Sequence, residues 1–260
     1  MTTKFLSAWA LLFLFSILPS GAESSTTSIF IFDASEMQDG EVDREALKEA
    51  SASGIFGSSL AEGQFTLKFQ NSTIPAQIVG TAKSRKALQI TLPGQTDAPL
   101  VTFEYVGTDL ASHIDEKKPL FLELEIQQGD VPSLFAAYLN FRPEARGWLS
   151  IALASVRTPD GPCLIFKSGP LSTADSLSGP SLPAGEPTVL RFEVLPGEEK
   201  AINNTILSSG SVLFDEQTIP AWLARTNLTE LSGVSITVQS FPGEESTESS
   251  FKILKVRAWQ

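Results

Sequence analysis

The sequence predicts an all-β protein, built as an antiparallel β-sandwich with one or two short helices. Apolar and polar residues alternate with a period of two through most of the chain, which is typical of strands with one buried face. Gly-Pro and Asp-Gly type turn signals interrupt this alternation at short intervals. The 18 Gly and 16 Pro residues leave little room for long helices. A chain of this length suffices for one large core, so we expect a single sandwich domain of about a dozen strands.

Six runs show the alternation most clearly. In each, every second side chain is apolar and the residues between are polar or charged, which separates a core face from a solvent face. The six runs cover residues 65–69, 88–92, 101–105, 122–126, 190–194 and 234–238. Two segments rich in Ser, Gly, Pro and Glu, residues 168–187 and 243–250, are expected to be long surface loops.

Two short helices are expected. Asp43 is a suitable N-cap for residues 44–51, whose Ala, Leu, Lys and Glu favour helix. Pro220 is suited to the first turn of a helix over residues 220–225. Neither segment carries a chemical motif, so we expect both to cover an end of the sandwich.

The N-terminal residues have the order of a secretory signal peptide. Lys4 precedes an apolar run from Phe5 to Leu18, Pro19 interrupts it, and small residues lead to Ala22. The run is shorter than the roughly 20 residues that span a bilayer. We therefore expect residues 1–22 to be removed after Ala22. Residues 23–260 would then form the mature domain, secreted or periplasmic and without a membrane anchor.

The amino-acid composition limits the classes of molecule that this protein is expected to bind. The chain has 19 Lys and Arg against 30 Asp and Glu, a net charge of −11, and its basic clusters are small. Nucleic acid is an unsuitable partner because phosphate binding requires a basic patch. The single cysteine, Cys163, excludes an intramolecular disulfide, and its apolar surroundings favour a buried structural thiol. A leader combined with so little cysteine favours a bacterial source. The oligomeric state stays open.

The sequence contains few candidate residues for nucleophilic catalysis or for metal binding. A Ser-His-Asp triad or a Cys-His dyad would require His113, the single histidine, which lies in a polar segment and is expected to be an exposed loop residue. One His and one Cys do not supply the usual zinc ligands. Loop acids such as Asp109, Asp115 and Asp130 are expected in so acidic a chain and receive no calcium assignment. We expect no cofactor, no metal and no catalytic residue.

The order of these features resembles the concanavalin A-like lectin/glucanase family in its laminin-G-like form. The resemblance lies in an early strand at residues 87–90, a central meander, a strand at 185–194, and closing strands at 232–236 and 251–257. It is one of strand pattern, not of signature residues. It implies a jelly roll of two curved sheets and, loosely, glycan binding.

Glucanases of this family carry Glu-x-Asp-x-x-Glu on one strand. The nearest stretch here has Glu123, Glu125 and Gln128, so Asp is replaced by Glu and the final acid by Gln, which cannot act as a general acid. The pattern favours a non-catalytic protein. A divergent glycoside hydrolase or polysaccharide lyase with paired carboxylates is the alternative, and a structural or protein-contact module is a third.

One polar surface is predicted as a candidate binding site. If residues 121–127, 135–142 and 148–156 form three consecutive strands, alternation places one set of side chains on the face away from the core. A tight turn at 143–147 would set Arg142 beside Trp148 and Asn140 beside Ser150. Acids, amides, an Arg and aromatic rings suit sugars, while the alternative is a solvated face with a stabilising Arg–Trp pair. The predicted ligand-binding residues are Glu123, Glu125, Gln127, Tyr138, Asn140, Arg142, Trp148 and Ser150.

Overall fold

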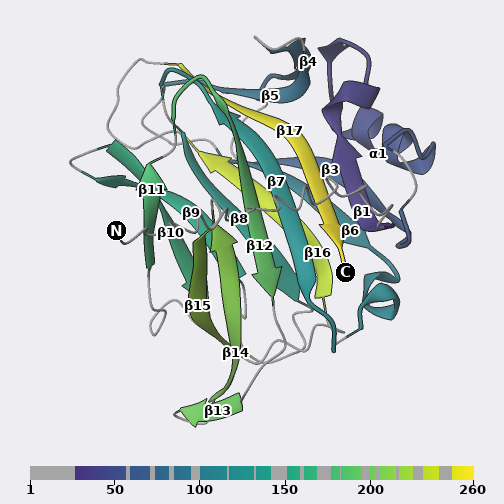
Figure 1. Ribbon diagram of the computed structural model, residues 1–260. Helices are drawn as coiled ribbons and strands as arrows, with labels where there is room; N and C mark the ends of the chain where they lie inside the picture. The colour runs from purple at the N-terminus through teal and green to yellow at the C-terminus, as the bar shows by residue number, and fades with distance from the viewer. Residues whose placement is uncertain are drawn as a thin grey trace, which may run out of the picture.

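The computed structural model is a sandwich of two antiparallel sheets with a small third sheet beside it (Figure 1). It describes residues 27–56, 59–70, 74–81, 85–94, 100–115, 117–131, 133–141, 151–158, 161–168, 177–181, 183–194, 199–202, 205–214, 217–224, 231–239 and 248–260. The predicted signal peptide lies outside these residues. The predicted all-β class and sandwich architecture are confirmed.

The first sheet, sheet A, has seven strands. In spatial order they are β12 (Pro187–Val194), β7 (Leu120–Gln128), β17 (Ser249–Trp259), β5 (Lys86–Leu92), β4 (Ala76–Gly80) and β2 (Gly40–Glu41), with β1 (Ser28–Asp33) also paired to β17. One edge of β17 pairs with β7, and the other pairs first with β5 and then with β1. The first and last described strands therefore lie side by side at the centre of sheet A.

The second sheet, sheet B, also has seven strands. Their order is β11 (Leu177–Ser181), β10 (Gly161–Ser168), β9 (Ile151–Thr158), β8 (Leu134–Phe141), β16 (Leu231–Gln239), β6 (Leu100–Gly107) and β3 (Gly63–Gln70). All six runs predicted from alternation are strands of sheet A or sheet B. The predicted loop at 168–187 is wrong in part, because residues 177–181 form β11 and pair with β10.

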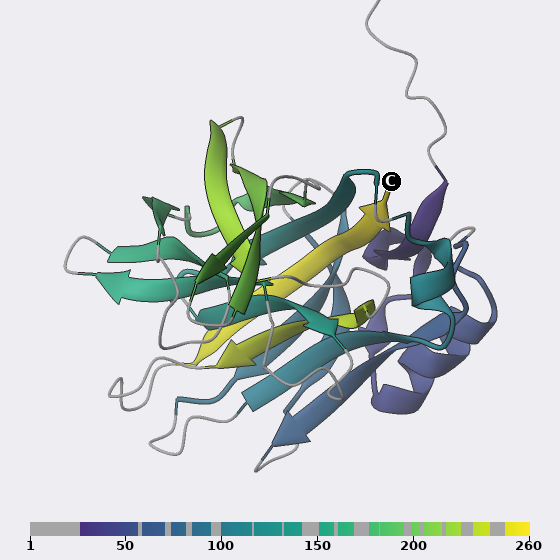
Figure 2. The same cartoon turned by 90° about the horizontal axis from the view of Figure 1, so that it is seen from below.

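A third sheet contains β13 (Glu199–Ile202), β14 (Thr205–Phe214) and β15 (Gln217–Ala224). Figure 2 shows it projecting from the sandwich on the side away from the helix. The helix predicted at 220–225 is wrong, since this segment pairs with β14, and Pro220 lies opposite Ser211. Proline is tolerated there because β15 is an edge strand of the described sheet, where a backbone N–H is not required on the free side.

The predicted helix near residue 44 is confirmed. It is α1 (Arg44–Ala52), the α-helix of the described residues, and the Asp43 carboxylate accepts a hydrogen bond from the Ala46 backbone N at 2.8 Å. Such a cap stabilises a helix by about 1 kcal/mol. Two short 3-10 turns, η1 (Ala34–Glu36) and η2 (Leu110–His113), complete the described elements.

An aromatic cluster fills the end of the core nearest α1. Phe32 of β1 packs 4.8 Å from Phe103 of β6, and Phe65 of β3 stacks on Phe103 at 5.3 Å between ring centroids. All three side chains are almost fully buried. Because β1 belongs to sheet A whereas β3 and β6 belong to sheet B, these rings join the two layers. Burying each contributes about 2–3 kcal/mol.

Candidate functional site

The predicted site is divided between two sheets. β7 carries Glu123, Glu125 and Gln127 and pairs with β12 and β17 in sheet A, whereas β8 carries Tyr138 and Asn140 and pairs with β9 and β16 in sheet B. The expected continuous face over three consecutive strands is therefore wrong. Arg142, Trp148 and Ser150 lie outside the described residues.

The connection between β7 and β8 explains the error, because it crosses between the sheets instead of forming a hairpin. The Gln128 side chain bonds both the N–H and the C=O of Ser133, at 2.8 and 3.0 Å, as a neighbouring strand would. Gly129 donates its N–H to the Ser250 carbonyl at 2.8 Å, and a Cβ at Gly129 would lie 2.4 Å from the Ser250 hydroxyl oxygen. A buried side-chain amide and an obligatory glycine thus build an arch from sheet A to sheet B.

Within the described residues, β8 pairs with β9. Tyr138 pairs with Ala152, and Leu139 pairs with Ile151. The predicted neighbours Arg142–Trp148 and Asn140–Ser150 involve residues outside the described part of the chain, so these pairs stay predictions. Phe135 and Ala137 of β8 are buried in the core.

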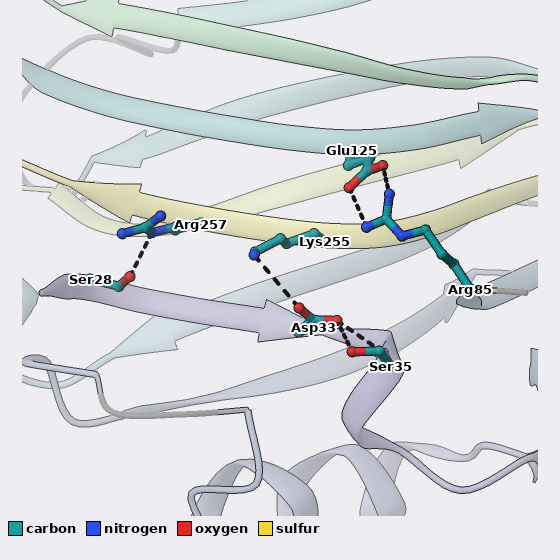
Figure 3. A network of polar contacts seen from close by, with 7 residues as sticks. All are labelled: Ser28, Asp33, Ser35, Arg85, Glu125, Lys255 and Arg257. Atoms are coloured by element: carbon teal, nitrogen blue, oxygen red, sulfur yellow. Dashed lines mark hydrogen bonds and ion pairs between the residues drawn. The ribbon is translucent and has the colours of Figure 1, made fainter. Parts of the chain in front are cut away.

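The three predicted residues of β7 are engaged on the outer face of sheet A. Arg85 holds Glu125 through two hydrogen bonds, of which Nη2 to Oε2 measures 2.7 Å, and these bonds raise the pKa of the Arg85 guanidinium (Figure 3). Arg191 donates from Nε to Glu123 at 3.0 Å. The Gln127 amide donates to the Gly185 carbonyl at 2.8 Å. The two glutamates have arginine partners, so they do not form an open carboxylate pair. The Gln127 Oε1, in contrast, is buried without a hydrogen-bond partner among the described residues.

Further charges on sheet A are paired along neighbouring strands. The Lys255 ammonium lies 3.6 Å from the Asp33 carboxylate, and Arg257 donates from Nε to the Ser28 hydroxyl at 2.8 Å (Figure 3). The Trp259 ring has the Arg257 guanidinium at 4.9 Å and the parallel ring of Phe121 at 5.3 Å. The outer face of sheet A is therefore a ladder of mutual contacts.

The outer face of sheet B has a different character. Thr66, Glu104 and Ser235 lie in register across β3, β6 and β16, and the same row reaches Tyr138 on β8. Their residue exposures are 5%, 8% and 7%, although they alternate with the core residues of their strands. Glu104 pairs with the Lys68 ammonium at 2.5 Å. We call Thr66, Glu104, Ser235 and Tyr138 the polar row.

One group of the polar row has no hydrogen-bond partner within the described residues. The Thr66 hydroxyl oxygen is buried and unpartnered. On the next row, the hydroxyl oxygens of Thr102 and Thr237 lie 3.4 Å apart. An unpartnered buried hydroxyl costs about 1–3 kcal/mol, so its retention needs an explanation. The sequence showed the alternation at residues 65–69 but gave no signal that Thr66 would be buried.

The other candidates have structural surroundings. His113 ends η2 and is half-buried, with Nε2 2.8 Å from the Asp109 carboxylate, so the expectation of an exposed loop histidine is wrong. Cys163 lies on β10, as its apolar run predicted, but its side chain is outside what the structure describes. The described residues contain no group of three His, Cys, Asp or Glu side chains placed to hold a metal. Among them, no helix has the length and apolarity to cross a bilayer.

Comparison with known proteins identifies structures of similar fold and no relative by sequence. No protein-family model matches the chain, and no curated protein matches it significantly. The Emp47p carbohydrate recognition domain is similar, with 11% identity and a TM-score of 0.46 over 92% of this chain and 99% of that domain. A legume lectin-like domain from Entamoeba histolytica has 11% identity and a TM-score of 0.44 over 75% of this chain and 89% of that one. The VIP36 exoplasmic/lumenal domain, in a Ca²⁺/Man3GlcNAc-bound form, has 10% identity and a TM-score of 0.43 over 75% and 83%.

These similarities concern fold class alone. With TM-scores below 0.5, they carry no argument about the superfamily of this chain, and the resemblance to the concanavalin A-like jelly roll stays an expectation from the strand order. The chain is an antiparallel β-sandwich by its own sheet topology, and its chemistry must be argued from its own residues.

Proposed function

We propose that this protein is exported and binds a glycan or another extracellular polymer, without transforming it, over the outer face of sheet B. The observation that carries the proposal is the polar row with its unpartnered Thr66 hydroxyl. A buried hydroxyl without a partner is unfavourable in the isolated protein, and a ligand hydroxyl would complete its hydrogen bonding if the side chains over it moved aside on binding.

The neighbouring groups suit a polyhydroxylated ligand. Glu104 supplies carboxylate oxygens that accept hydrogen bonds, and Lys68 supplies N–H donors. Tyr138 occupies the register position opposite Ser235, where an aromatic residue would offer a ring for the C–H face of a sugar. Of the site residues predicted from the sequence, Tyr138 and Asn140 belong to β8, a strand of the proposed surface.

A glycan array with the mature chain, followed by calorimetric titration of any ligand found, tests the proposal. We expect Glu104→Gln and Tyr138→Ala each to weaken binding about tenfold or more, as expected when a hydrogen-bonding or stacking group is lost from a binding site. Glu123→Gln is the matched control, because it makes the same chemical change on the outer face of sheet A.

The alternatives give different results. Absence of binding to every polysaccharide tested would reject a glycan ligand. Binding that survives both sheet B substitutions would reject this surface, and binding lost only in Glu123→Gln would transfer the site to sheet A.

A further inference from the structure

Two glutamates on the outer faces of the sheets are buried but are held in different ways. Glu125 on sheet A is 9% exposed, and Glu104 on sheet B is 8% exposed. Arg85 holds Glu125 through two hydrogen bonds from its planar guanidinium. Within the described residues, the one polar partner of the Glu104 carboxylate is the Lys68 ammonium, at 2.5 Å. A buried carboxylate needs a counter-charge and several hydrogen bonds, so Glu104 is held less completely than Glu125.

Lys68 is a partner that can be displaced. It lies on β3, at one edge of sheet B, and its side chain is 56% exposed, whereas the Glu104 side chain is 11% exposed. A lysine ammonium is a compact charge on a flexible stem, unlike the rigid fork of an arginine. An ion pair with a solvent-exposed lysine contributes little to stability. Rotation of the Lys68 stem toward solvent would therefore release Glu104 at a small energetic cost.

Hydroxyl groups lie beside this ion pair. Thr66 and Ser235 occupy the register positions on either side of Glu104, and the Thr66 hydroxyl has no partner within the described residues. On the next row, the hydroxyl oxygens of Thr102 and Thr237 lie 3.4 Å apart. The sequences of β3, β6 and β16 contain one cation and one anion, which are the two members of this ion pair. The patch is therefore rich in oxygen acceptors, and its counter-charge comes from a single mobile side chain.

The buried charge of Glu104 limits which ligands can use this patch. If Lys68 stays in place, the Glu104 carboxylate remains occupied. If a neutral ligand displaces Lys68, a buried carboxylate loses its counter-charge, which is strongly unfavourable. A ligand with an ammonium group of its own replaces the Lys68 ammonium charge for charge and avoids this penalty.

From these features we infer that the ligand of the sheet B surface carries a free ammonium group, which takes the place of the Lys68 ammonium at Glu104 while a ligand hydroxyl bonds Thr66. The inference rests on the proposed function and names its ligand class, a glycan of amino sugars whose amines are not acetylated. Lys68 is then an internal competitor of the ligand and not a donor to it. The net charge of −11 also attracts a polycation to this chain.

Three tetrasaccharides with one backbone test the inference. Fully deacetylated chitosan tetrasaccharide, chitin tetrasaccharide and cellotetraose bear an amine, an acetamide or a hydroxyl at the same position of each ring. They are titrated calorimetrically into the mature chain at mildly acidic pH, where the amines are protonated. We expect the chitosan tetrasaccharide to bind about tenfold or more tightly than the other two, because it alone supplies a counter-charge to a buried carboxylate.

Glu104→Gln tests the location of the ammonium site. This variant should abolish the preference for the chitosan tetrasaccharide, because the amide carries no charge. Glu123→Gln makes the same change on the outer face of sheet A and should retain the preference. If circular dichroism shows Glu104→Gln to be unfolded, Thr66→Val takes its place and should weaken the chitosan tetrasaccharide about threefold, as expected for one lost hydrogen bond.

Lys68→Met separates the two roles of the lysine. Without the internal competitor, the chitosan tetrasaccharide should bind about two- to fivefold more tightly, the effect of one exposed ion pair that no longer has to be broken. A lysine that donates to a neutral glycan predicts weaker binding in the same variant. Lys252→Met removes a lysine charge from β17 of sheet A and should leave the affinity unchanged.

The outcomes distinguish this inference from the proposed function. Equal binding of all three tetrasaccharides, weakened by Glu104→Gln, would overturn the inference and leave the glycan surface in place. Weaker binding in Lys68→Met, or no binding of the chitosan tetrasaccharide, would also overturn it, while the glycan array decides the proposed function separately. A preference for the chitosan tetrasaccharide that survives in folded Glu104→Gln would show attraction to the acidic chain as a whole, which overturns the inference as well.

Discussion

The outer faces of the two large sheets arise from the same alternating pattern but satisfy their polar groups in different ways. On sheet A, Glu125 and Glu123 are held by arginines from separate parts of the chain. On sheet B, Thr66 is buried without a partner among the described residues, and Glu104 beside it is more than nine-tenths buried. Sheet A thus pairs its outward carboxylates with arginines and leaves one amide oxygen, that of Gln127, without a partner, whereas on sheet B the unpartnered group is a hydroxyl in register with a buried carboxylate.

The largest effect is expected from breaking the sheet A ladder at Glu125. Glu125→Ala should lower the free energy of unfolding by about 2 kcal/mol, because a nearly buried carboxylate and its two hydrogen bonds are lost and Arg85 is left without its partner. Urea denaturation followed by tryptophan fluorescence measures this. Glu41→Ala, at an exposed position of β2, is the control and should change stability by less than about 0.5 kcal/mol. A loss at Glu125 no larger than the control's would show that the ladder does not stabilise the sheet.

On sheet B, we expect a substitution to raise the free energy of unfolding instead of lowering it. Thr66→Val keeps the shape of the side chain and removes the unpartnered hydroxyl, so the free energy of unfolding should rise by about 1 kcal/mol. Thr102→Val is the matched control and should destabilise slightly, because its hydroxyl lies 3.4 Å from that of Thr237. The same denaturation series gives both values. If Thr66→Val destabilises the protein as much as Thr102→Val does, the contrast between the faces fails.

The smallest change in stability is expected from Asp109, which lies in the segment between β6 of sheet B and β7 of sheet A. The hydrogen bond with His113 lowers the pKa of Asp109 below its ordinary value. A carboxylate whose pKa is lower in the folded state contributes stability above its unfolded pKa, near 4, and this contribution is lost as the pH falls through the folded pKa. Asp109→Asn should therefore reduce the acid-induced loss of stability between about pH 5 and pH 2.

Denaturation at several pH values, with Glu36→Gln as an exposed control, measures the Asp109 effect. If the stability of Asp109→Asn falls with decreasing pH as steeply as that of the unchanged protein, the Asp109–His113 hydrogen bond contributes nothing to folding. A pairing that does contribute would show that partnered charges stabilise the junction of the two sheets as they do sheet A.

Local patterns predicted the strands well because alternation reports which face of a strand is buried. They also predicted the helix that starts at Arg44, with bounds 44–51 against the observed 44–52, because Asp43 and the residues after it act within one turn. Alternation does not report which strand lies alongside. The crossing from β7 of sheet A to β8 of sheet B involves the hydrogen bond from the Gly129 N–H to the Ser250 carbonyl, and that bond joins residues far apart in sequence.

The candidate site was predicted less completely for the same reason. Tyr138 and Asn140 belong to β8, and Tyr138 is in register with Ser235, yet the other members of the polar row come from β3, β6 and β16. The partners of Glu125 and Glu123 lie 40 and 68 residues away along the chain. Only the folded sheets bring these groups together, so the sequence could not show which polar residues were free to bind.

The position of β17 has a consequence for the order of folding. This strand lies between β7 on one edge and β5 and β1 on the other. The central pairings of sheet A therefore cannot form until residues 249–259 have been synthesised. Pairings that span more than 200 residues, such as Ser28 with Trp259, form slowly because a long loop must close first. Until then β7, β5 and β1 would expose unpaired edges that invite aggregation. A product truncated before residue 249 would therefore lack the strand that joins β7 to β5 and β1 in sheet A.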